Sequence, residues 1–401
     1  TGPLLPDLSV VIISIFFFYL SVKNKNYYYL KNKYFLIFLS FCILITFKSL
    51  LSENINLSLT SSSFYIRFGL FSLAIWMLLE KDLNFIFILK NIFLLIIAVL
   101  FIDSIFQFLL GKNLLGFEYV NATNFRITSF FGDDEVLGSY VARFFPFVIS
   151  LIFFHEYKTK KKINKIFFVI LILIIFILVF LSGERTSFVL LLISSILIFL
   201  SCKNLRKYFI LSFVSALIVI TIISYFNPKI KFRMFDSVIS QLGFEKGNVV
   251  IFSKTYEGHY KISLNMFKEK PIFGHGVKMF RVYCQKPENF IEENKYQACT
   301  THPHNVYMQF LAETGIIGFI YLLSVFFIIS YFILKNIYYS IFKSAQCFSD
   351  YKVCILVFYF VTLFPFAPSG NFFNNWLSII YYLPAGFLLY LNNNDLKKNE
   401  L

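Results

Sequence analysis

The chain has 401 residues, of which 58% are hydrophobic and 56 are phenylalanine, and its mean hydropathy is +0.71. Soluble globular domains use fewer apolar residues, so the composition excludes a purely soluble protein of this length. The net charge of +15 would suit a nucleic-acid partner. However, the basic residues lie in alternate loops between apolar runs, so we interpret the charge as a signal of membrane topology and expect no nucleic acid.

Eleven apolar runs are long enough to cross a membrane as helices, which satisfy their backbone hydrogen bonds internally. The predicted fold class is therefore all-α, a polytopic membrane helix bundle of about 11–12 helices. The first run lacks a basic leader and a small-residue cleavage site, so we expect no cleavable signal peptide. The eleven runs comprise residues 4–22, 34–50, 64–79, 85–110, 137–154, 166–181, 187–202, 209–226, 315–334, 353–366 and 376–391.

Alternate loops are rich in lysine and arginine, and the positive-inside rule places these loops and the C-terminus in the cytoplasm. The loops between them then face the other side, and the longest of these is residues 227–314. This alternation predicts three parts: a membrane block at 1–226, a mainly helical external loop at 227–314, and a closing membrane block at 315–401. The basic clusters lie at residues 23–33, 158–165, 203–207, 335–352 and 397–398.

The external loop contains two cysteines, Cys284 and Cys299. Both would face an oxidising compartment, so we expect a disulfide between them, which would stabilise the loop by roughly 3 kcal/mol. The alternative is a pair of unbonded thiols.

The stretch at residues 300–319, TTHPHNVYMQFLAETGIIGF, places two histidines and an asparagine directly before a predicted span. Thr301 is expected to cap a helix whose first turn contains Pro303 and His304. In that turn the helix dipole and partial burial disfavour the imidazolium, so His304 would be a neutral general base near pH 7. The alternative is a histidine that only caps a loop helix, and we expect His302 to orient the turn.

Polar side chains continue along the same short helix. Asn305, Gln309 and Glu313 recur at four-residue intervals and therefore share one face. This stripe at the membrane edge favours a functional interpretation of His304, with Asn305 and Gln309 as substrate-binding candidates.

Arg185 follows a membrane run in LVFLSGERTSFVLLLI, where there is almost no room for a loop. A charged residue at such a position is costly unless it is paired or faces a polar cavity. The planar guanidinium stays charged and donates two hydrogen bonds at once, which suits a phosphate. The alternative is an arginine that reaches the lipid headgroups.

Further cationic candidates are Arg126 and three loop residues, His259, Lys261 and Arg281. Residues 227–314 contain twelve Lys or Arg against eight Asp or Glu, an excess of four. Such a modestly cationic cap suits a diphosphate, and it also suits anionic lipid headgroups.

Several of these motifs together resemble the O-antigen ligase and O-antigen polymerase superfamily. The resemblance rests on His304-Asn305 followed after nine residues by Gly315 and Gly318, on PIFGHGVKMFR upstream, and on the arginine in SGERTSFVL. The segment FRITSFFGDDEVLGSYVARFFP is similar to a weaker upstream element of the family. The resemblance covers roughly residues 125–334.

The resemblance implies an integral glycosyltransferase of the GT-C-like type in the bacterial inner membrane, with its active site on the periplasmic side. Members transfer a glycan from undecaprenyl diphosphate to an acceptor sugar, without a metal or other cofactor and with inversion. The family's catalytic histidine falls on His304 and its first arginine on Arg185. Its second arginine falls near His259, so Lys261 or Arg281 would have to supply the missing phosphate contact.

The implied partners are an undecaprenyl-diphosphate-linked oligosaccharide donor, a sugar acceptor, membrane lipids and, as a further candidate, a chain-length regulator. The acceptor would be a lipid-linked glycan in a repeat-unit polymerase or the lipid A core in an O-antigen ligase. The altered second arginine favours the polymerase. A flippase for lipid-linked sugars would also need many helices and a cationic cavity, but inverted repeats and broken midplane helices are not evident in the sequence.

Overall fold

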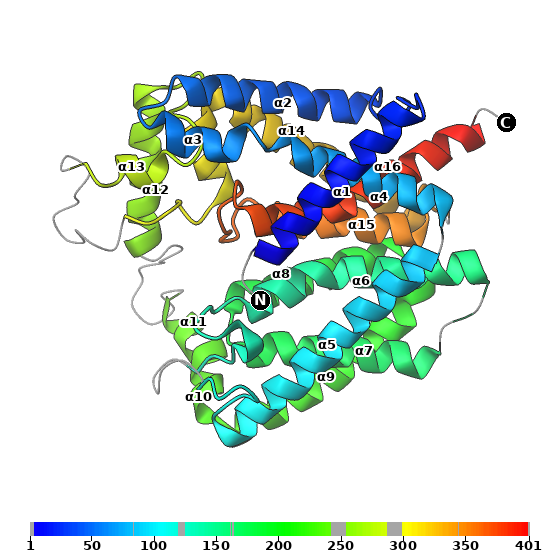
Figure 1. Ribbon diagram of the computed structural model, residues 1–401. Coiled ribbons are helices and arrows are strands. Elements are labelled where there is room, and N and C mark those ends of the chain that lie inside the picture. The colour runs from blue at the N-terminus through cyan, green and yellow to red at the C-terminus, as the bar shows by residue number, and fades with distance from the viewer. Residues whose placement is uncertain are drawn as a thin grey trace. The chain divides into compact units, whose positions relative to one another are not determined.

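The computed structural model describes residues 4–82, 84–118, 125–160, 162, 164–241, 254–286, 299–343 and 345–399. These residues form helices joined by short turns, with 77% helix and no strand in the described parts (Figure 1). The predicted all-α class is confirmed.

The eleven apolar runs that the sequence predicts as spans all fall on helices, and the chain is a polytopic helical membrane protein. Among the described residues, seven helical stretches are long and apolar enough to cross a membrane. Six of them are α1 (Leu4–Lys23), α2 (Lys33–Leu50), α5 (Asn84–Leu110), α6 (Leu137–Thr159), α14 (Val306–Phe342) and the pair α3 (Ile55–Ser62) and α4 (Ile66–Lys81); the seventh joins η2 (Lys203–Leu205) to α9 (Arg206–Phe226).

Four further helices account for the remaining predicted runs. α7 (Lys165–Leu181) and α8 (Arg185–Ser201) are apolar but shorter, with 17 residues each. α15 (Asp350–Thr362) has 13 residues and ends four residues before the predicted run does, and α16 (Asn375–Asn399) has 25. The number of helices that cross the membrane therefore stays a prediction.

The chain divides into two compact units, each built from segments that are distant in sequence. The first unit contains Thr1–Leu83, Phe252–Ile328 and Leu363–Leu401, and the second contains Asn84–Ile251 and Ile329–Thr362. The three parts predicted from the sequence divide the chain by membrane topology, whereas the two units divide it by packing. The predicted boundaries at residues 226 and 314 therefore stay predictions.

In the first unit, the loop helices α12 (Lys254–Glu269) and α13 (Phe280–Tyr283) pack on the beginning of α14 (Figure 1). Their shared core explains why α12 has one apolar face, since the residues at helical spacing on that face are the buried ones. The core consists of Ile262, Met266, Met279, Phe280, Tyr283, Cys284 and Ala312.

A kink at Gly315 divides α14 into a short first segment and a long apolar second segment. Gly315 has φ +65° and ψ −164°, a conformation that only glycine adopts readily. The PIFGHG turn fits into this kink: the His275 amide donates to the Ala312 carbonyl, and the Ile316 amide donates to the Pro271 carbonyl. A Cβ at Gly315 would lie 2.4 Å from the Ile272 carbonyl oxygen, so the close approach requires glycine.

In the second unit, α6 is the most buried long helix and packs against α5, α7, α8 and α15. After α9 the chain forms three short elements: α10 (Pro228–Lys231), a π-helical turn η3 (Phe232–Asp236) and α11 (Ser237–Gln241). These elements pack against one another and bring the start of the predicted external loop to the turn between α7 and α8, where Arg185 lies.

Candidate active site

Asn305, and not Thr301, caps the first segment of α14. The helix begins at Val306, and the Asn305 Oδ1 accepts from the amides of Tyr307 at 3.0 Å and Met308 at 3.1 Å. The predicted Thr301 cap with His304 inside the first turn is therefore wrong. Asn305 caps the helix because its side-chain oxygen reaches the unpaired amides at the helix start. The Thr301 hydroxyl instead forms a hydrogen bond with the His302 ring.

His304 thus lies in the turn before the helix, where its backbone has a positive φ of 53°. Left-handed backbone is uncommon for residues other than glycine, and it persists only where the surroundings hold it. Here the His304 carbonyl accepts from the Ser369 amide at 2.9 Å, and the neighbouring Asn305 Nδ2 donates to the Pro365 carbonyl at 2.7 Å. The segment at 363–374 therefore fixes the turn that presents the His304 ring.

Three histidines gather at this turn. The His304 ring centroid lies 4.2 Å from that of His302 and 5.3 Å from that of His259, with Tyr256 at 6.0 Å. Burial, followed by repulsion from His259, lowers the pKa of His304 below its usual value. The imidazole of His304 is therefore neutral at pH 7, as a general base requires.

His302 is bound through both ring nitrogens. Its Nε2 lies 3.2 Å from the Ser369 carbonyl and its Nδ1 lies 3.0 Å from the Thr301 hydroxyl. A carbonyl can only accept, so Nε2 carries the proton and Nδ1 accepts from the hydroxyl. Burial and the adjacent His304 lower the pKa of His302 to about 3, which keeps this ring neutral.

The polar stripe on α14 holds neighbouring segments together. The Gln309 Nε2 donates to Asn371 Oδ1 at 2.8 Å and to Glu313 Oε2 at 3.0 Å, and the Gln309 Oε1 accepts from the Phe372 amide at 3.0 Å. Glu313 is fully buried and also accepts from the Phe280 amide at 3.2 Å. In these contacts Asn305 and Gln309 position the turn.

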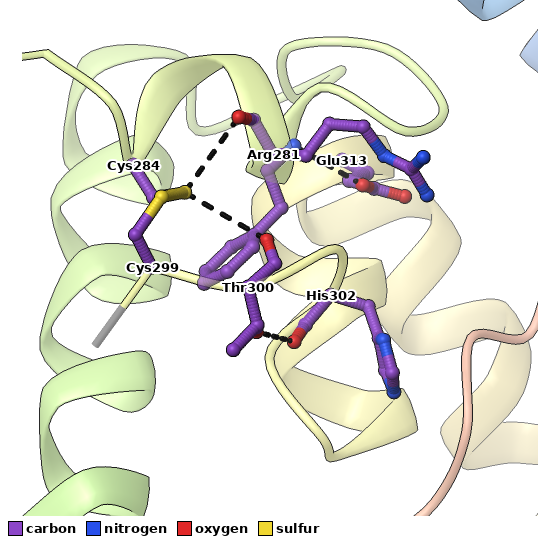
Figure 2. The surroundings of a disulfide bond; sticks show 7 residues. Arg281, Cys284, Cys299, Thr300, His302 and Glu313 are labelled. Carbon is purple, nitrogen blue, oxygen red and sulfur yellow. Dashed lines mark hydrogen bonds between the residues drawn. A yellow bond between two sulfur atoms is a disulfide. The ribbon is translucent and has the colours of Figure 1, made fainter. Parts of the chain in front are cut away.

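Arg281 lies on α13 beside the buried Glu313 carboxylate, with His302 on the neighbouring segment (Figure 2). Its charge also acts on Lys278 and on the neutral His302 ring, so these three side chains share one region of the first unit. Lys261 is exposed on α12, two residues from the buried His259. Residues two apart on a helix point in different directions, so Lys261 does not share the direction in which His259 meets the His304 ring.

The disulfide between Cys284 and Cys299 is present, with a Cα–Cα distance of 5.1 Å (Figure 2). It joins the end of α13 to the segment that leads into Thr300 and His302. The Cys284 Sγ lies 3.7 Å from the Thr300 carbonyl oxygen. The covalent bond therefore ties the helix that carries Arg281 to the turn that carries the histidines.

Arg185 and Arg126 come together in the second unit. Arg185 is the first residue of α8, and Arg126 lies on the segment that packs against the preceding turn. Gly183 permits this packing because it has φ +67° and a Cβ there would lie 2.6 Å from the Phe125 carbonyl oxygen. Arg126 forms an ion pair with Glu135, and it also repels Arg185 electrostatically.

Arg233 is a third cation in this group that the sequence did not single out. Its Nε donates to the Gly183 carbonyl at 3.2 Å, and Arg185 Nε donates in turn to the Arg233 carbonyl at 2.8 Å. Burial, followed by repulsion from Arg126 and Arg185, lowers the pKa of Arg233 to about 10. The sequence signal was weak, because Arg233 lies among the basic residues that follow a membrane helix.

Both groups of residues fall within one recognisable domain, apart from Arg126. Residues 166–323 match the family model Wzy_C, which is described as O-antigen ligase. Residues 166–323 therefore form a domain similar to O-antigen ligase. This domain includes Arg185, Arg233, His259 and His304, and it confirms the resemblance to the O-antigen ligase and polymerase superfamily. No curated protein matches the chain.

Proposed function

We propose that the protein is a glycosyltransferase of the bacterial inner membrane that transfers an undecaprenyl-diphosphate-linked glycan to an acceptor sugar hydroxyl on the periplasmic side. The observation that carries this proposal is the neutral, strained His304 turn inside a domain similar to O-antigen ligase. A flippase would have no use for a neutral base fixed in this way.

His304 acts as the general base. The acceptor hydroxyl gives its proton to the His304 ring while its oxygen attacks the anomeric carbon, and the bond from that carbon to the phosphate oxygen breaks. A single displacement of this kind inverts the anomeric carbon. General bases contribute about 10²–10⁴-fold to such reactions.

Arg185 stabilises the undecaprenyl diphosphate leaving group, with Arg126 as a second cation. Guanidinium groups neutralise charge that develops on phosphate oxygens, so the reaction as proposed does not require a metal ion. Arg281 is proposed to replace the second family arginine, since its charge acts on His302 whereas Lys261 is exposed on α12. His259 is proposed to make His304 less basic, because electrostatic repulsion from His259 lowers the pKa of His304.

We assign the reaction to repeat-unit polymerisation, with transfer to lipid A core by a ligase as the alternative. The residue His259 at the place of a family arginine distinguishes the chain from typical ligases. Purified protein supplied only with lipid-linked single repeats would produce a ladder of longer lipid-linked chains if it is a polymerase. Product that appears only when lipid A core is added would instead identify a ligase.

A further inference from the structure

The side chain of Arg185 is held by the start of the predicted external loop. Its Nε donates to the Arg233 carbonyl at 2.8 Å and its Nη2 donates to the Ser237 hydroxyl at 2.6 Å. The Ser237 hydroxyl itself donates to the same Arg233 carbonyl at 2.9 Å. Two neighbouring donors on one guanidinium therefore engage two linked acceptors, which fixes the direction of the planar group.

The π-helical turn η3 makes this arrangement geometrically available. In an α-helix the Ser237 amide would donate to the Arg233 carbonyl, four residues earlier. Here the Ser237 amide donates to the carbonyls of Phe232 and Phe235 instead. The Arg233 carbonyl accepts from the Arg185 side chain. Single π-helical turns occur frequently at functional sites, and this turn has a specific structural consequence for Arg185.

The contact is reciprocal, because Arg233 donates from its own Nε to the Gly183 carbonyl at 3.2 Å. Gly183 lies two residues before Arg185 in the tight turn between α7 and α8. Each arginine therefore binds the backbone of the segment that carries the other. The turn and the π-helical segment are locked together by their two arginines.

Three arginines lie close together at the lock. Arg126, Arg185 and Arg233 repel one another, as their mutual electrostatic effects indicate. The nearby carboxylates are Glu135, which pairs with Arg126, and Glu184, which accepts from the amides of Gly138 and Ser139. A cluster of three guanidinium groups favours an anionic ligand.

We propose that Ser237 and Arg233 are positioning residues for Arg185, and that Arg233 adds a third guanidinium to the site for the donor diphosphate. This inference rests on the proposed function. It assigns to residues 232–237 the task of orienting the cation that stabilises the leaving group. Arg233 is thus expected to act both through its backbone carbonyl and through its charge.

The test for Ser237 combines transfer kinetics with the Kd for undecaprenyl diphosphate in detergent. Losing one hydrogen bond to a charged group should lower kcat and weaken diphosphate binding about tenfold in Ser237→Ala. Ser237→Thr keeps the hydroxyl and should restore both. Ser194→Ala is the matched control, because the Ser194 hydroxyl bonds only the Leu191 carbonyl of its own helix at 2.9 Å. In the Arg185→Ala background, Ser237→Ala should change the Kd no further.

The test for Arg233 separates charge from backbone contact. Arg233→Ala should weaken diphosphate binding at least about tenfold, whereas Arg233→Lys, which keeps the charge, should lose less. Equal Kd values for wild type and Arg233→Ala would overturn the third-cation assignment. Ser237→Ala kinetics equal to those of Ser194→Ala, or an equal Ser237→Ala effect with and without Arg185, would overturn the positioning role.

These failures are distinguishable from a failure of the proposed function. If Arg185→Ala keeps full transfer activity, the proposed role of Arg185 in stabilising the leaving group is wrong. If Arg185→Ala is inactive while the Ser237 and Arg233 variants behave as wild type, only the further inference falls. Melting temperatures of all variants identify any that do not fold. If Arg233→Ala does not fold, Ser237→Ala still decides the test of the positioning role, because it removes only one hydroxyl.

Discussion

The imidazole rings of His302 and His304 lie 4.2 Å apart between centroids, and both ring nitrogens of His302 are engaged by hydrogen bonds, to Thr301 and Ser369. Within the described part of the chain, the His304 ring has no such pair of bonds. The two rings therefore differ in their hydrogen bonding although they are two residues apart. With its pKa lowered to about 3, His302 supports the turn as a neutral group. His304 is the ring that the turn presents.

The acid side of the pH profile reports on His304. Burial and His259 lower the pKa of His304 below the usual 6.5, so the neutral base persists down to moderately acidic pH. We expect kcat/KM to be constant near neutral pH and to fall as pH drops through a midpoint below 6.5.

The His259→Gln variant tests the cause of that midpoint. It removes a group that repels the His304 imidazolium, so the acid midpoint should move to higher pH. His275→Gln is the control, because His275 binds the Met266 carbonyl at 2.9 Å within the PIFGHG turn. An unchanged midpoint in His259→Gln would contradict the proposed coupling.

The Cys284–Cys299 disulfide should contribute to both stability and activity. Removing the bond, by reduction or by Cys284→Ser with Cys299→Ser, should lower the free energy of unfolding by about 3 kcal/mol. The turn at Thr300 would then lose its covalent tie to α13, and the transfer rate should fall. Thermal unfolding with and without reductant measures the first effect. Cys347→Ser, at a half-buried free cysteine, should change neither quantity.

Asn305 is expected to stabilise the protein through its cap. Asn305→Ala removes the acceptor for the Tyr307 and Met308 amides and should cost about 1 kcal/mol. Asn305→Ser keeps a capping oxygen but cannot donate to the Pro365 carbonyl, so it separates the cap from the tether. We expect Asn305→Ser to recover melting temperature more fully than transfer rate. Equal recovery of both would argue against a positioning role.

Gly315→Ala should be among the most destabilising small substitutions. It forces an alanine into φ +65° and ψ −164° and places its Cβ against the Ile272 carbonyl oxygen. The backbone strain alone is worth about 1–3 kcal/mol. Gly116→Ala is the matched control, because Gly116 also has a positive φ of 87° but no atom lies within 4 Å of its added Cβ. Equal losses of melting temperature in both variants would show that the close approach at the kink is unimportant.

The sequence predicted the features that depend on local pattern. Apolar length placed helices on all eleven runs, and the two cysteines of the predicted external loop indicated the disulfide. The His304 motif was identified because polar residues beside a membrane span are unusual. The cap was misassigned between Thr301 and Asn305 because both residue types are good caps, and their choice depends on the contact of Asn305 with Pro365.

Contacts between segments that are distant in the chain could not be predicted from local sequence patterns. Ser369 and Asn371 hold the His304 turn and Gln309 from more than 60 residues away, and neither residue belongs to a periodic pattern. Arg233 was hidden among basic residues that the positive-charge count treated as a group. Its role depends on a π-helical turn, a local backbone form that residue spacing does not indicate.

His304 is proposed to take the proton of the acceptor hydroxyl. The most direct measurement is single-turnover transfer from a lipid-linked glycan by purified His304→Ala, with its melting temperature and diphosphate Kd measured in parallel. His155→Ala serves as a histidine control outside the turn. If His304 is the general base, the transfer rate should fall by at least about 10²-fold while folding and diphosphate binding are retained. A His304→Ala enzyme that keeps more than about a tenth of the wild-type rate would contradict it.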